Sequence, residues 1–295
     1  MSLASPLTRV LLITAGLFTA SGAQATLIVN SPRPIEYQVK VQLIRTAHDD
    51  GSPLATAFGS ASQRAYIESR VNDVWAQAGI QVDFADSIQQ LNSTTAYGSA
   101  SSVDQLVTLG YSAGVLSNEP FTLNLFLVNK VPGYTSHAAN SSAGLARVSG
   151  NGIALFVGTT LLGSNNGRDV IAKVAAHEIG HNLGLTHVST AENLLASGGG
   201  ARLTTQQISQ VLNSFFVQPL PTLAGDFNGD GSVDAADYSA WRDGLGTLYS
   251  QQDYRDWREN FGKTQAPLAS SNSSLPEPTA LALLAAVLAG LVARR

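Results

Sequence analysis

The eleven residues from His177 to His187 constrain this chain more than any other segment. They read HEIGHNLGLTH and hold three of the five histidines in 295 residues. The preceding GRDVIAKVAA favours a helix, and positions i and i+4 share one helix face, so His177 and His181 are expected side by side. Gly184 stands where a glycine adopts a positive φ and ends a helix. The chain can then turn and bring His187 to the same point.

Three imidazoles that meet at one point predict a site for a divalent metal. Zinc binds histidine nitrogen at about 2.0–2.1 Å, and three protein ligands leave a fourth position for water and substrate, as in catalytic sites. Glu178, beside the first ligand, is placed to act as general base on a water held there. The chain has no cysteine, so nitrogen and oxygen must supply the ligands. The alternative interpretation is a helix with incidental surface histidines.

The extended pattern H-E-x-x-H-x-x-G-x-x-H resembles that of the metzincin zinc metallopeptidases. HNLGLTH and GLARV, Gly144 to Val148, are most similar to the reprolysin or adamalysin branch. The resemblance implies an α/β (α+β) fold in residues 26–217, with a metzincin-like mixed five-stranded sheet and an active-site helix.

The same resemblance implies the roles of the site residues. Zinc would bind to His177, His181 and His187, and Glu178 would be the base of a secreted metalloendopeptidase that cleaves protein or peptide substrates. In that family an edge strand pairs with the main chain of the substrate. The matching positions here are Gly144, Leu145 and Ala146.

Two positions depart from the family pattern. Metzincins have a Met-turn beneath the zinc, but the only methionine here is Met1, and Leu195 occupies the expected place. Leucine is similar in volume and apolarity. Val188 stands where reprolysins usually have aspartate. The missing methionine supports an alternative function, a catalytically weak or inactive surface adhesion or binding protein that keeps the zinc fold.

Hydrophobic periodicity predicts alternating strands and helices across this domain. A capping box of Thr204 and Gln207 predicts the start of its last helix. The expected strands are Glu36–Ile44, 80–85, 121–131 and 152–160, and the expected helices are 62–79, 168–183 and 204–216.

A second cluster, DFNGDGSVDAAD, predicts one calcium ion. Oxygen ligands in a twelve-residue loop suit calcium, and Gly231 supplies the sharp turn at position 6. A merely solvated acidic loop is the alternative. The expected ligands are Asp226, Asn228, Asp230, the carbonyl of Ser232, Asp234 and Asp237.

This loop and its helix resemble the dockerin type I repeat, in which two repeats pack together and bind a cohesin. DYSAWRDGLG, from Asp237, is echoed by DYRDWRENFG, from Asp253. LGTLYSQQ before the second helix lacks the aspartates, which leaves a cohesin-like partner in doubt. We expect a small α-helical calcium module at 226–262, after a linker at 218–225.

Both ends of the chain predict export. Residues 1–25 have the basic, apolar and small-residue order of a signal peptide. Residues 276–295, after a spacer at 263–275, resemble the PEP-CTERM sorting signal, which an exosortase removes; membrane anchors are the alternative at both ends. We expect the export machinery and an exosortase as partners, at the envelope, surface or extracellular matrix of a bacterium. The net charge is −4, and no basic stripe argues for a nucleic-acid partner.

Overall fold

The computed structural model describes residues 29–220 and 223–264. The chain divides into two compact units between Thr222 and Leu223. The predicted signal peptide at 1–25, the predicted sorting signal at 276–295 and most of the predicted spacer lie outside the described residues. Within the described residues, no helix is long and apolar enough to cross a membrane.

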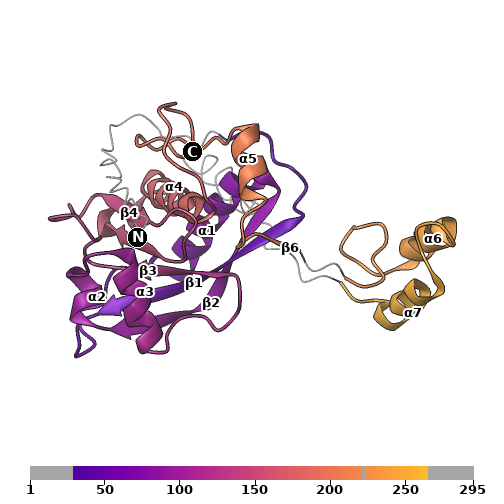
Figure 1. Cartoon of the computed structure of the whole chain (residues 1–295), viewed down its shortest axis with the longest axis horizontal. Coiled ribbons are helices and arrows are strands. Elements are labelled where there is room, and N and C mark those ends of the chain that lie inside the picture. Colours follow the sequence, from indigo (N-terminus) through magenta and orange to yellow (C-terminus); the bar gives the residue numbers. More distant parts are fainter. Residues whose placement is uncertain (1–28, 221–222, 265–295) are drawn as a thin grey trace, which may run out of the picture. The chain divides into compact units, whose positions relative to one another are not determined.

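A mostly parallel sheet forms the centre of the larger unit (Figure 1). Its strand order is β2-β1-β3-β5-β4. β2 (Ile80–Asn92), β1 (Tyr37–Ala47), β3 (Thr122–Leu127) and β5 (Ile153–Val157) run parallel to one another. β4 (Ser142–Ala146) lies at the edge and pairs antiparallel with β5. This arrangement confirms the predicted α/β fold with a mixed five-stranded sheet.

Helices cover both faces of this sheet. Alternate strand residues point to opposite sides, so each face presents apolar side chains on which helices pack. One face packs against α1 (Ala61–Trp75) and α4 (Asn165–Asn182) in the main hydrophobic core. The opposite face, which includes Ile44, packs against α2 (Thr94–Gly98) and α3 (Val103–Ser112). The long helix α4 is thereby held on the sheet along its buried side.

The first helix of the larger unit begins and ends close to the prediction. Ser60 and Gln63 form a capping box at the start of α1. The helix tightens into a short 3-10 turn (Ala76–Ala78), and Gly79 at φ 69° ends it, at the last residue of the predicted span 62–79. Another 3-10 turn (Thr159–Gly163) precedes α4.

The helix α5 (Thr205–Val211) is shorter than the predicted span of 204–216. Its start agrees, because Thr204 and Gln207 form the predicted capping box. Just beyond its end, the side-chain amide of Asn213 donates to the carbonyl of Ser209, four residues earlier. This local bond competes with continuation of the helix.

Two residues of the predicted linker take part in the sheet. β6 (Gln218–Pro219) pairs antiparallel with Tyr37 and Gln38 of β1. The first two residues of the predicted linker therefore belong to the larger unit, and the two-residue strand gave no periodicity from which it could be predicted.

The smaller unit holds α6 (Ala235–Gly244) and α7 (Gln251–Asn260), the two helices of the sequence echo. Their contacts are reciprocal. The indole N–H of Trp241 donates to the carbonyl of Ser250, which caps α7, at 2.8 Å. The indole N–H of Trp257 donates to the carbonyl of Asp234, which caps α6, at 2.7 Å. The duplicated sequence thus forms a pair of helices in which each tryptophan bonds the start of the other helix.

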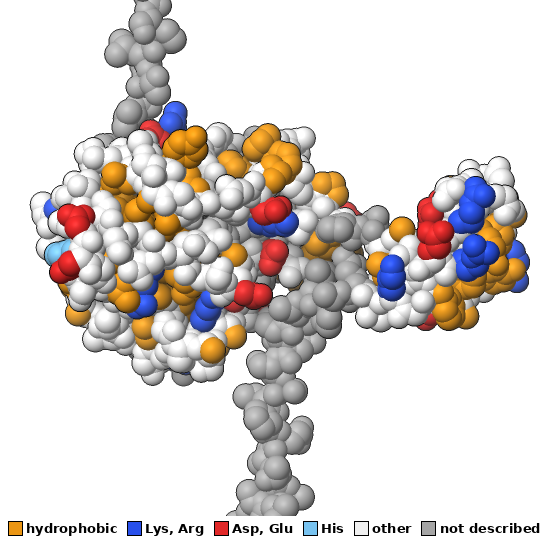
Figure 2. All heavy atoms as spheres, turned by 90° about the horizontal axis from the view of Figure 1, so that it is seen from below, with side chains coloured by type: hydrophobic (Ala, Val, Ile, Leu, Met, Phe, Trp, Pro, Cys, Tyr) orange, Lys and Arg blue, Asp and Glu red, His pale blue; other side chains and the backbone are white. Residues whose placement is uncertain are grey.

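Hydrophobic side chains also reach the surface of the smaller unit (Figure 2). Leu248, in the loop before α7, and Phe261, which follows α7, are both exposed. No side chain of α7 is fully buried. The unit therefore has a thin core, in which aromatic rings of α6 and α7 contact one another, most of them in tilted or edge-on arrangements.

Candidate metal centre

The C-terminal end of α4 places the first two histidines, and a glycine turn places the third. The N–H of Gly184, at φ 100°, donates to the carbonyl of His181, and the N–H of Leu185 donates to the carbonyl of Gly180, both at 2.9 Å. This pair of bonds is the Schellman arrangement that ends helices. The predicted role of Gly184 is confirmed, and the chain after it turns back towards α4.

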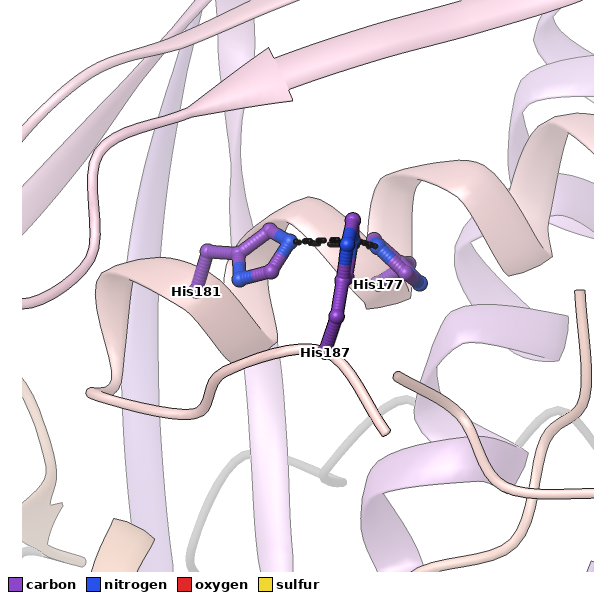
Figure 3. Close-up of side chains that lie close together, drawn as sticks. All are labelled: His177, His181 and His187. Carbon is purple, nitrogen blue, oxygen red and sulfur yellow. Dashed lines mark hydrogen bonds between the residues drawn. The ribbon is translucent and has the colours of Figure 1, made fainter. Parts of the chain in front are cut away.

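The three histidine rings converge on one point (Figure 3). The Nε2 atom of His177 lies 3.0 Å from that of His187 and 3.1 Å from that of His181, and the third separation is also 3.1 Å. Within the described residues, this is the only group of histidine, aspartate or glutamate side chains whose ligand atoms converge in this way.

Backbone carbonyls determine which nitrogen of two of the rings carries the proton. The Nδ1 atom of His177 lies 2.6 Å from the carbonyl oxygen of Leu194. That of His181 lies 2.8 Å from the carbonyl oxygen of Leu185. A carbonyl can only accept, so each Nδ1 donates its hydrogen and each neutral ring keeps a lone pair on Nε2. Such outer hydrogen bonds are typical of histidines that bind metals.

The spacing of the nitrogens fits zinc. Nitrogens 3.0–3.1 Å apart could all bind one ion at the usual Zn–N distance of about 2.0–2.1 Å. The nitrogen donor set and this geometry together match a zinc site of three histidine ligands with one position left for substrate.

Burial keeps these rings in the neutral form that binds metals. Desolvation lowers the pKa of His177 to about 3 and that of His181 to about 4. It also lowers the pKa of His187, which is less buried. Protons therefore do not compete with a metal at neutral pH.

Glu178 lies beneath the edge strand β4. Glu178 is only 1% exposed, and this burial raises the pKa of its carboxyl to about 8. A hydrogen bond from the backbone of Ala146 acts in the opposite direction and lowers that pKa. Gly144, two residues earlier on the same face of β4, also lies against the Glu178 side chain. The structure thus brings the predicted base and two of the predicted edge-strand residues together.

Leu195, at the predicted Met-turn position, is fully buried under α4. A Cβ atom built on Gly180 would lie 3.3 Å from Cδ2 of Leu195. The leucine therefore packs on α4 between the two histidine ligands. The amide oxygen of Asn193 accepts from the N–H of Leu195 at 2.9 Å. The neighbouring carbonyl of Leu194 is the one that holds His177. One short turn therefore supplies both the apolar floor and a hydrogen bond to a ligand.

Asn182 connects α4 to the β4–β5 hairpin. It is fully buried, and its amide donates to the carbonyls of Arg147 and Gly152 at 2.9 and 3.2 Å. From the hairpin, the N–H of Ser149 donates to the carbonyl of His181 at 2.9 Å. These bonds fix the position of β4 relative to the histidines.

Sequence reasoning missed Asn182 and Asn193. Both are asparagines in apolar surroundings within or near the histidine segment, which was the available signal. The predicted strand GLARV was also misplaced at one end, because Arg147 and Val148 follow β4 in the turn.

The predicted calcium ligands lie in one loop of the smaller unit. Within this loop the carboxylates of Asp226 and Asp237 accept backbone N–H groups at 2.8–3.2 Å. Asp237 is fully buried, whereas Asp230 and Asp234 are exposed. Calcium therefore stays a prediction from the sequence.

Several solved structures are similar to this chain. Archaemetzincin from Methanopyrus kandleri is 16% identical, with a TM-score of 0.42, over 60% of this chain and 95% of that one. Metalloproteinase-II from Bacteroides fragilis is 15% identical, with a TM-score of 0.37, over 64% of this chain and 56% of that one. Archaemetzincin from Archaeoglobus fulgidus is 17% identical, with a TM-score of 0.35, over 58% of this chain and 99% of that one. No curated protein sequence matches the chain significantly.

The family comparison identifies the larger unit. The Matrixin family model matches residues 34–207, more than half of the chain, and this span contains the three converging histidines. The reprolysin branch suggested by HNLGLTH and GLARV stays a prediction. The chain belongs to the Matrixin family of zinc metallopeptidases.

Proposed function

We propose that this protein is a zinc endopeptidase in which Glu178 is the general base. The observation that supports this best is the convergence of three Nε2 atoms at 3.0–3.1 Å beside a buried carboxyl group. Zinc, when bound there, acts as a Lewis acid and makes water nucleophilic at neutral pH.

The chain's own residues would divide the remaining work. His177, His181 and His187 hold the metal, and the carbonyls behind the first two rings keep them oriented. Glu178 takes a proton from the attacking water and delivers it to the leaving amide nitrogen. A nearby cation lowers the pKa of a carboxyl, which offsets the raised pKa of Glu178 and favours the ionised base.

The position of β4 supports cleavage within a chain. β4 pairs with β5 on one side, and no strand among the described residues pairs with its other side. An extended peptide can add there as an antiparallel strand through main-chain hydrogen bonds. Such binding needs no free terminus, so an internal peptide bond can be presented to the site.

A cleavage assay tests this proposal. The purified protein with one equivalent of zinc is incubated with casein, with and without chelator, beside Glu178→Gln as a variant of matched size. Cleavage that both treatments abolish supports the endopeptidase. Stoichiometric zinc without cleavage would instead support a surface binding protein, the alternative that the missing Met-turn methionine suggested.

We also propose that the loop from Asp226 to Asp237 binds one calcium ion, on the basis of its ligand order. Ordering by calcium would stabilise a unit with so thin a core. Calorimetric titration of the protein with calcium, beside an Asp226→Asn variant, tests the site. One bound ion that the variant loses is expected, and no heat from either protein would refute the site.

Export and sorting are further proposals that rest on the sequence alone. Residues 1–25 would direct secretion, and residues 276–295 would be removed by an exosortase at the bacterial envelope. Mass spectrometry of the protein from a host with and without an exosortase tests both steps. Chains that keep both ends in either host would contradict the proposal.

A further inference from the structure

Gly144 in β4 lies in direct contact with the proposed base. A Cβ atom built on this glycine would fall 2.5 Å from Cγ of Glu178, 2.8 Å from Cδ and 2.7 Å from Oε1. Real Cβ contacts are essentially never shorter than 3.0 Å. Any side chain at position 144 therefore overlaps the Glu178 side chain where it now lies.

Space rather than backbone conformation explains the glycine. Gly144 is not among the glycines with a positive φ, and it pairs in regular register with Leu155 of β5. Its backbone is one that any residue adopts. The strand backbone would accept an alanine, and the three atoms nearest to its Cβ all belong to Glu178.

Neither partner can relieve this overlap freely. β4 is held by five consecutive register pairs with β5, and the Asn182 amide fixes the hairpin beyond it. Glu178 is buried on α4, and its carboxylate accepts the backbone hydrogen bond of Ala146. The closest contact involves Cγ, near the base of the side chain, so a small rotation of the carboxylate does not remove it.

We infer that Gly144 is a positioning residue, whose missing side chain lets β4 hold the Glu178 carboxylate in its working position. The same strand would then bind the substrate and orient the base, which fixes the distance between the two. This inference rests on the proposed function, in which Glu178 transfers the proton. It assigns Gly144 a role different from the substrate contact that the sequence suggested.

A stability cycle tests the contact without any activity. Gly144→Ala is expected to lower the melting temperature by about 2–10 °C, since overpacking a filled site is destabilising. In a Glu178→Ala background, which lacks Cγ, Cδ and Oε1, the same change is expected to cost little. Gly163→Ala is the control, because a Cβ there meets nothing within 4 Å. Equal losses in both backgrounds would overturn the inference.

Kinetics test the positioning role. Gly144→Ala is expected to keep one equivalent of zinc and a KM within about threefold of wild type, while kcat falls about 10²-fold, a loss that a 1 Å misplacement can cause. An unchanged kcat or a loss of zinc would each refute the role.

Two further outcomes remain decisive. If Gly144→Ala does not fold, the Gly144→Ala/Glu178→Ala protein is expected to fold and bind zinc; its failure to do so would overturn the inference. If the wild type cleaves nothing, the proposed function fails, and the stability cycle still decides whether Gly144 makes room for Glu178.

Discussion

The Nε2 atoms of His177 and His181 face each other at 3.1 Å, and neither carries a proton. Both rings donate Nδ1–H to carbonyl oxygens, so two lone pairs point at each other and towards a third imidazole. Such an arrangement is repulsive in the absence of a cation. Metal binding is therefore expected to contribute to the stability of the larger unit.

Removal of zinc is expected to lower the melting temperature. A ligand that binds the folded state alone stabilises it by about 4 kcal/mol at a thousand times its dissociation constant. Differential scanning calorimetry with added zinc, and again after dialysis against chelator, measures the difference. His187→Ala, which removes one ligand, is expected to respond less to zinc. A melting temperature that is independent of zinc would contradict the site.

The stability of the metal-free protein is expected to depend on Glu178 and pH. Burial raises the pKa of Glu178 to about 8, above its ordinary 4.5, so the folded state keeps a proton that the unfolded state releases. This contribution to stability is complete below pH 4.5 and is lost as the pH rises through 8. Glu178→Gln removes the titration and is expected to be more stable than wild type at pH 9, by on the order of 4 kcal/mol.

Urea denaturation in chelator at pH 5 and pH 9 measures this difference. The histidines act in the opposite sense, because burial lowers the pKa of His177 and His181, and their contribution is lost as the pH falls below 6.5. Wild type and variant share that effect, so it cancels in the comparison. Equal stability of the two proteins at pH 9 would show that the carboxyl is not buried.

Leu195 is expected to be replaceable by methionine but not by alanine. Leu195→Met conserves volume beneath Gly180 and should change the free energy of unfolding by less than about 1.5 kcal/mol. Leu195→Ala leaves a cavity under the ligand helix and should cost about 2–5 kcal/mol. Chemical denaturation with zinc analysis measures both variants. Loss of zinc from the methionine variant would show that methionine cannot replace leucine beneath the histidines.

Local patterns predicted the parts of the fold that local chemistry determines. Alternation of apolar residues located β1, the Thr204 capping box located the start of α5, and Gly184 ended α4 as predicted. The histidine spacing predicted the ligand set, because i, i+4 geometry and one glycine turn are enough to bring the three rings together.

Contacts between distant segments could not be predicted in this way. The close approach of Gly144 to the Glu178 side chain depends on how β4 packs against α4, which no spacing in either segment encodes. The bond from His177 to Leu194 likewise joins residues that only the folded chain brings together. In the smaller unit the aspartate order predicted a calcium site, but not that the carboxylate of Asp237 accepts three backbone N–H groups of the same loop.

Asn182→Ala is expected to impair peptide cleavage more than zinc binding. The change leaves the carbonyls of Arg147 and Gly152 without their donor, at a cost of about 1–3 kcal/mol in unfolding free energy. It also loosens β4 over Glu178, whereas both carbonyls behind the first two ligands remain. Zinc analysis and casein cleavage, with Asn213→Ala as an exposed control, separate the effects; loss of zinc with unchanged cleavage per bound zinc would refute this coupling.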